Sequence, residues 1–173
     1  MPSTTVIALL MLTSAVERKS VNICELVRHA EKYSNKLVTV TGDYMAGPHG
    51  ATIALEQCGF QSRYPPFRSG AAIAVDRCDS SAKLPVAAKG LLDLHSIQHF
   101  DKAMEEALVR SQDADLDIPI SVLGLIKVAD HYTTQDSRDG GFEGTGYGFL
   151  GRYPAQITIL RIVQYQITIP KSN

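Results

Sequence analysis

The sequence lacks an excess of positive charge. Among its 173 residues, 17 Lys and Arg oppose 18 Asp and Glu, which gives a formal net charge of -1. Proteins that bind nucleic acid or anionic membranes gather cationic charge on one face. The overall charge therefore gives no reason to expect either partner, and only a local basic patch would favour nucleic acid.

A long apolar run is also missing. The run near the start, residues 6–12, is shorter than the about 20 residues that cross a bilayer. Small residues follow at 13–15, as at an export cleavage site, but no Lys or Arg precedes Arg18. Residues 1–20 are therefore interpreted as either a signal peptide or a disordered N-terminus, and residues 21–173 as one folded domain.

The few cysteines follow no metal or redox pattern. Cys24, Cys58 and Cys78 have none of the spacings typical of zinc or redox sites. In an oxidising compartment we expect a disulfide between Cys58 and Cys78, because both lie at the ends of neighbouring predicted strands. In the cytosol all three would be buried thiols.

Catalytic and phosphate-binding motifs are missing too. The glycine loop, residues 140–154, precedes a strand, whereas a dinucleotide fingerprint needs a helix there. No Gly-Lys-Ser/Thr ends a P-loop, and neither Gly-x-Ser-x-Gly nor a cysteine signature supplies a nucleophile. We predict no catalytic residue and no cofactor. We interpret the chain from His131 to the end of the glycine loop as one long loop between two strands, which uses glycine for positive φ.

Two segments have the periodicity of helices. Asn22 and Glu25 form a capping box ahead of an apolar stripe, which predicts a helix over 23–33. Apolar residues recur at helical spacing from Ile97 to Leu108 and predict a second helix with a polar outer face.

Five segments alternate apolar and polar residues, as β-strands do. They cover about 38–44, 52–57, 71–75, 118–128 and 155–169. Gly42 and Gly124 lie on the inward faces of the first and fourth, where a barrel strand bends sharply. In the last segment the alternation shifts near Leu160, which predicts a β-bulge. Three strands, a helix and two strands is the order of the OB fold. We therefore predict a mainly β protein, a five-stranded OB-like barrel with a helix between strands 3 and 4 and an extra N-terminal helix.

Two stretches resemble a known family. Residues 24–42 resemble the opening CELV-x-PEKY-x-GK-x-VTV-x-G of small bacterial OB-fold proteins, which are similar to the tRNA-anti-like OB group, and residues 146–157 resemble their G-x-GHLG-x-YPA-x-L. The resemblance implies an OB fold and a periplasmic or secreted location rather than a cytoplasmic one, but no activity. Phe149 replaces the usual histidine, and His29 and Ala30 replace Asn-Pro.

The predicted binding face lies between the first strand turn, residues 44–50, and the glycine loop, because these connections flank the binding face of OB folds. A protein, peptide or glycan partner suits the nearly neutral charge. The candidate ligand-binding residues are Tyr44, His49, Tyr132, Arg138, Phe142, Tyr147, Phe149 and Arg152.

Two alternative functions stay open. Aromatic rings could stack on single-stranded nucleic acid if arginines formed a basic stripe, although the last loop is acidic. The arginines in question are Arg63, Arg68, Arg77 and Arg152. His95 and His99 are spaced i and i+4, so a helix could present both to a metal, with His131 completing a hydrolase site.

Overall fold

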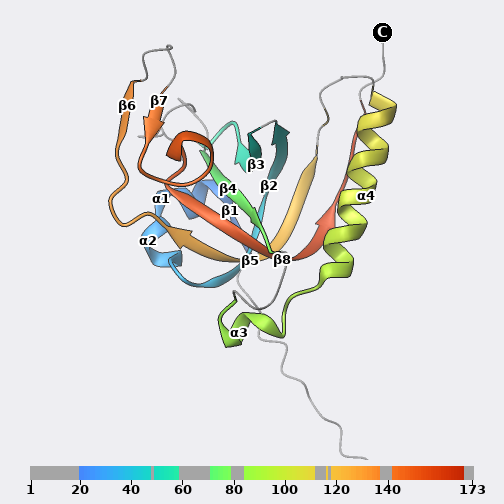
Figure 1. The fold of residues 1–173 in the computed structure, drawn as a ribbon, viewed down its shortest axis with the longest axis horizontal. Helices are drawn as coiled ribbons and strands as arrows, with labels where there is room; N and C mark the ends of the chain where they lie inside the picture. Colours follow the sequence, from blue (N-terminus) through green and yellow to red (C-terminus); the bar gives the residue numbers. More distant parts are fainter. Residues whose placement is uncertain are drawn as a thin grey trace, which may run out of the picture.

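The computed structural model describes residues 20–47, 49–58, 71–78, 84–111, 116, 118–136 and 142–169, and of 134–136, 142–143 and 149 it describes the backbone alone. The strands are β1 (Ser20–Asn22), β2 (Leu37–Gly47), β3 (Gly50–Leu55), β4 (Ala71–Arg77), β5 (Pro119–Val128), β6 (Thr134–Asp136), β7 (Phe142–Gly144) and β8 (Ala155–Tyr165). The helices are α1 (Ile23–Arg28), α2 (Ala30–Tyr33), α3 (Val86–Lys89) and α4 (Leu94–Ser111), with a short 3-10 turn, η2 (Phe149–Gly151). Figure 1 shows the helices arranged around the strands. In this part of the chain no helix is both long and apolar enough to cross a membrane.

Five strands close into a barrel. Their order is β2-β3-β4-β8-β5, and β5 pairs with β2 to complete the ring. β4 and β8 run parallel, whereas the other neighbours in the ring are antiparallel. With α4 between β4 and β5, this is the predicted mainly β, OB-like barrel. β1, which was not predicted, pairs parallel with β2 outside the ring.

Two inward-facing glycines, at which the sequence predicted sharp bends of the strands, allow neighbouring elements to approach each other inside the barrel. A Cβ added at Gly42 would lie 2.7 Å from Ile53 Cγ2, and one added at Gly124 would lie 2.4 Å from Ile157 Cγ1. Real Cβ atoms do not come so close to a neighbour. Any larger residue at either position would therefore push packed strands apart.

β8 bends at the predicted bulge. The residues on either side of Leu160 pair with the adjacent β5 residues Leu123 and Gly124, so Leu160 is an extra residue on the β8 side. A second extra residue, Val163, follows in the same strand. Extra residues of this kind bend a strand and increase its twist. The side chain of Leu160 is fully buried, in a small cluster beside the main core.

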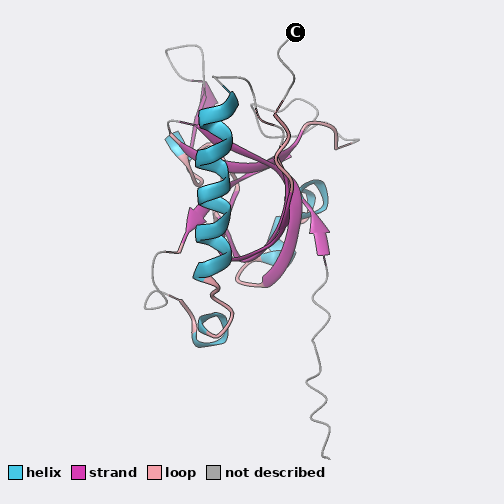
Figure 2. Ribbon diagram, turned by 90° about the vertical axis from the view of Figure 1, so that its right-hand side faces the viewer, coloured by secondary structure: helices cyan, strands magenta, loops and turns pink. Residues whose placement is uncertain are grey.

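Beyond the bulge, α4 covers the edge of β8. β4 pairs with β8 only as far as Ile159. Past that point the Asp93 amide donates to the Leu160 carbonyl at 2.7 Å, and the Ile162 amide donates to the Ser96 hydroxyl at 3.0 Å. Asp93 also caps α4, because its carboxylate accepts from the Ser96 amide at 3.1 Å. The start of α4 is thus fixed to the barrel, and Figure 2 shows the helix standing against it.

The predicted N-terminal helix forms as two shorter ones. Asn22 caps α1 as predicted, since its side chain accepts from the Glu25 amide at 2.8 Å. At His29 the backbone leaves the helical region, with φ -129° and ψ 39°, and α2 begins after it. The Tyr33 hydroxyl donates to the Glu25 carboxylate at 2.7 Å and so links the two helices across this break.

Three predicted elements differ from the structure in extent. α4 buries most of its predicted stripe, but Leu108 is 54% exposed and is not a core residue. β8 ends at Tyr165, so the strand predicted as far as residue 169 was too long. The region predicted as one loop from His131 contains the hairpin of β6 and β7, which Figure 1 shows projecting from the barrel.

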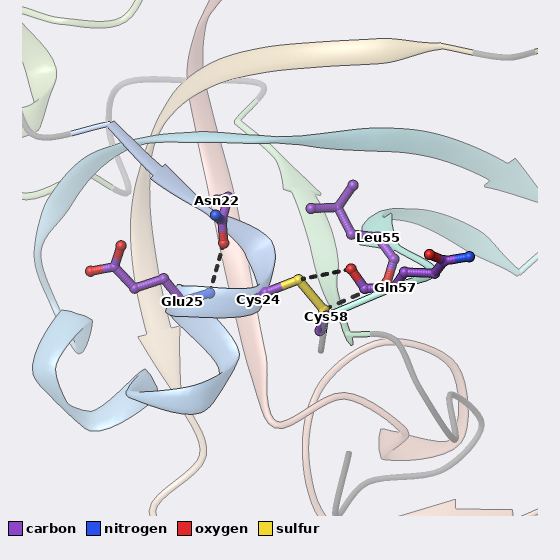
Figure 3. Close-up of a disulfide and its surroundings, with 6 residues drawn as sticks. All are labelled: Asn22, Cys24, Glu25, Leu55, Gln57 and Cys58. Carbon is purple, nitrogen blue, oxygen red and sulfur yellow. Dashed lines mark hydrogen bonds between the residues drawn. A yellow bond between two sulfur atoms is a disulfide. The ribbon is translucent and has the colours of Figure 1, made fainter. Parts of the chain in front are cut away.

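A disulfide joins Cys24 of α1 to Cys58, just after β3 (Figure 3). The predicted pairing of Cys58 with Cys78 was therefore wrong, and Cys78 is a buried thiol at the end of β4. The prediction compared strand ends alone. In the structure α1 packs against β3 and β4, which brings the Cα atoms of Cys24 and Cys58 to 5.2 Å. The disulfide ties the helix to the barrel wall.

The contact at Gly124 predicts a large loss of stability on a small substitution. Gly124→Ala would place a methyl group against Ile157 and against the Thr158 carbonyl, so the free energy of unfolding should fall by about 1–3 kcal/mol. Gly90→Ala is the matched control, because nothing lies within 4 Å of a Cβ at Gly90. Urea denaturation measures both. Equal stability of the two variants would contradict the argument.

The disulfide predicts a second stability change. It closes a loop with a sequence separation of 34 residues, so the double variant Cys24→Ser, Cys58→Ser should lose about 3–4 kcal/mol of unfolding free energy. Reductant should lower the denaturation midpoint of the wild type and leave that of the double variant unchanged. A wild-type midpoint that does not respond to full reduction would show that the bond has no stabilising role.

Candidate functional site

A cleft of about 340 Å³ lies between the β2–β3 turn and the glycine loop. One wall is the tip of the β2–β3 hairpin, and the floor is Ala74 and Val75 of β4. The opposite wall is Gly148, Arg152 and Tyr153 of the glycine loop. The two predicted binding segments therefore do border one concave surface, at the place where OB folds bind their ligands.

The hairpin wall consists of small residues around one exposed methionine. Gly47 pairs with Gly50 and Ala46 pairs with Ala51, so at these two pairs the hairpin presents nothing larger than a methyl group to the cleft. Met45 is 52% exposed and lines the same wall. A flexible thioether side chain adapts to apolar partners of different shapes. Apart from His49 and Thr52, the side chains described on this wall are apolar.

The glycine loop is held by hydrogen bonds at its base and along its length. The Ala129 amide donates to the Pro154 carbonyl at 3.0 Å, directly beyond the last paired residues of β5 and β8. Further in, the amides of Tyr147 and Tyr153 donate to each other's carbonyls, at 2.8 and 3.1 Å. The Gly146 amide donates to the carbonyl of Gly151 at 2.9 Å.

The glycines of this loop are required by close backbone packing and by positive φ. A Cβ at Gly146 would lie 2.0 Å from the Tyr153 carbonyl oxygen, and Gly148 and Gly151 have φ of +71° and +63°. Gly148 is wedged between Ala74 and the Tyr153 ring, at 3.3 and 2.7 Å from its added Cβ. The loop is therefore a folded wall of the cleft. Strand β8 follows it, as predicted, so it does not present a helix terminus to phosphate.

Arg152 brings positive charge to this wall. Burial raises the pKa of the Tyr153 phenol above its usual value, and the neighbouring charge of Arg152 offsets part of that rise. Tyr153 therefore stays protonated at neutral pH and can donate or accept a hydrogen bond. No carboxylate is among the described residues that line the cleft, so its polar groups are hydroxyls, His49 and the guanidinium.

Apart from Tyr44, the predicted ligand-binding residues divide into three groups. His49 and Arg152 line the cleft. Tyr132 and Tyr147 support the loop, because their hydroxyls donate to the backbone carbonyls of Arg152 and Val128. Backbone alone is described for Phe142 and Phe149, and Arg138 lies outside the described residues.

Tyr44 is a core residue and does not reach the cleft. Its side chain is only 3% exposed, and its ring packs edge-on against Phe100 of α4 with 5.1 Å between centroids. The Arg77 guanidinium donates to the Tyr44 hydroxyl at 2.7 Å and forms an ion pair with Asp101. Burial lowers the pKa of Arg77, but the interactions with Tyr44 and Asp101 outweigh it and raise that pKa overall. Tyr44 therefore helps to dock α4 on the barrel.

The two alternative sites do not assemble among the described residues. Arg77 is engaged at α4 and is not among the described residues that line the cleft. Arg63 and Arg68 lie outside the described residues, so the basic stripe with Arg152 stays a prediction. His95 and His99 line a separate groove between α4 and β8, and His131 does not join them. Nowhere in the described ranges do three or more His, Cys, Asp or Glu side chains form a group that could hold a metal ion.

No protein-family model, curated protein or solved structure matches this chain. The resemblance to small bacterial OB-fold proteins therefore stays a prediction. The OB-like barrel rests on the strand order of the structure itself.

Sequence reasoning missed several cleft residues. Met45 follows the inward residue Tyr44 and so faces the opposite side of β2, a signal that the alternation already contained. Ala74 and Val75 enter the floor because β4 pairs with β3 at Thr52 and Ala51, a register that the sequence does not specify.

Proposed function

We propose that the chain is a non-catalytic binding module and that a peptide segment of a partner protein lies across the cleft. The observation that carries this proposal is the chemistry of the lining. Exposed Met45 and the small residues of the hairpin and the β4 floor form an apolar surface, bordered by His49 and Arg152. Apolar concave surfaces with a few polar groups at the edge are typical of peptide and ligand recognition.

A peptide fits this lining better than the other partner classes. Single-stranded nucleic acid binds along a row of aromatic rings in a basic groove. Besides the imidazole of His49, the described lining has one aromatic ring, Tyr153, which packs over Gly148, and one arginine. A glycan needs a dense set of hydrogen-bonding side chains, and beside Tyr153 the described lining offers three, Thr52, His49 and Arg152.

Peptide selection tests the proposal. Peptides selected from a random library on the immobilised protein should bind the variant Ala46→Trp at least tenfold more weakly than the wild type, because the indole would fill the cleft at its exposed hairpin wall. Val109→Trp is the control, since Val109 is 77% exposed on α4 and is not part of the cleft lining. Fluorescence polarisation measures the affinities. The proposal would be contradicted if the selected peptides bound both variants equally. Saturable binding of a poly-dT oligonucleotide in place of peptides would also contradict it.

We also propose that the protein works outside the cytoplasm. The disulfide between Cys24 and Cys58 supports this location, because cytosolic thiols are kept reduced whereas exported proteins retain such bonds. The resemblance to small bacterial OB-fold proteins also implies a location outside the cytoplasm.

Thiol counting in fractionated cells that express the protein naturally tests the location. The chain has three cysteines, so the unfolded, unreduced protein should take up one alkyl group, at Cys78, and reduction should expose the other two. Intact-mass spectrometry measures the number of alkyl groups before and after reduction. We expect to find the protein outside the cytoplasmic fraction. A cytoplasmic protein that takes up three alkyl groups without reduction would contradict the proposed location.

A further inference from the structure

A second concave surface lies beside the other end of β8. It is a groove of about 400 Å³ between the first turns of α4 and the end of β8. His95 and His99 of α4 line it from one side, and Gln164 and Tyr165 of β8 line it from the other. The described residues that line the cleft and those that line this groove do not overlap. The groove is therefore a surface separate from the proposed peptide site.

The two histidines project from the same face of α4. Residues spaced i and i+4 on a helix have Cβ atoms about 5–6 Å apart. Both His95 and His99 are exposed to solvent, and both line the groove. A pair of imidazoles at this spacing can bind one cation through one nitrogen each.

Tyr165 fixes the ring of His99. The Tyr165 hydroxyl and His99 Nδ1 lie 2.9 Å apart, and the Tyr165 ring packs edge-on against Phe100 at 5.1 Å. When Nδ1 carries the proton, it donates to the hydroxyl oxygen and leaves the lone pair on Nε2. Histidines that bind metal ions use this arrangement, in which a hydrogen bond to the second ring nitrogen sets the tautomer and the ring orientation.

We propose that His95 and His99 form a binding site for a divalent transition-metal ion, with Tyr165 as the positioning residue for His99. Neutral imidazole suits Zn²⁺, Ni²⁺ and Cu²⁺, whereas Mg²⁺ and Ca²⁺ take oxygen ligands. Two protein ligands leave the remaining coordination positions to water. The site is therefore a binding site for an exchangeable ion, and it differs from the three-histidine hydrolase site considered from the sequence because His131 has no part in it.

Calorimetric titration of the tag-free full chain with ZnCl₂, NiCl₂, CuCl₂ and MgCl₂ tests the proposal. The order of divalent-metal stability predicts that Cu²⁺ binds more tightly than Ni²⁺ or Zn²⁺ and that Mg²⁺ gives no binding at this site. His95→Ala and His99→Ala should each weaken Zn²⁺ binding at least tenfold. His131→Ala, which removes another exposed histidine, is the matched control and should leave the affinity unchanged.

Tyr165→Phe isolates the positioning role. It keeps the ring against Phe100 and removes only the hydroxyl, so Zn²⁺ affinity should fall about tenfold while the denaturation midpoint changes little. Long-range ¹H–¹⁵N spectra of the Zn²⁺-loaded wild type should show the His99 proton on Nδ1. Wild-type affinity in His95→Ala or His99→Ala would overturn the site, and wild-type affinity in Tyr165→Phe would overturn the role of Tyr165.

Discussion

The approach of β5 to β8 at Gly124 is the contact on which the rest of the structure depends. No side chain separates the two strands there, so β8 can pair with β5 along one edge while its first half pairs with β4 along the other. That double pairing closes the barrel. It also holds together the two ends of the connection between β5 and β8, which contains the glycine loop, since Val128 and Ala155 are opposite one another at its base. The position of one cleft wall therefore follows from barrel closure.

Much of the barrel was predictable because its strands obey a two-residue period. Gly42 and Gly124 stood out as glycines at inward positions, and the shifted alternation in β8 revealed the bulge at Leu160. The break at His29 was not predictable, because the apolar stripe of α1 and α2 continues through it. The predicted burial of Leu108 was wrong for a related reason. A helical stripe shows which residues share a face, but it does not show how far along the helix the barrel extends.

The candidate site was less predictable than the fold, because it depends on which strands pair and on their register. Tyr44 and Met45 are adjacent, and one position along a strand decides between the core and the cleft. The alternation already placed Tyr44 inward, so its assignment to the binding face conflicted with the strand pattern. The disulfide depends on packing in the same way: Cys24 meets Cys58 only because α1 folds back against β3. The spacing of the cysteines along the chain does not show which of them this packing brings together.

The bulge at Leu160 links barrel closure to the groove at the other end of β8. After Ile159 the strand leaves β4, and the bulge turns its free edge toward α4. Hydrogen bonds from Asp93 to Leu160 and from Ile162 to Ser96 then fix the first turn of α4 against that edge. Because His95 and His99 belong to the same turns, this attachment places them beside Tyr165. The groove is thus a consequence of how the barrel closes, because the same attachment of α4 to β8 forms both of its sides.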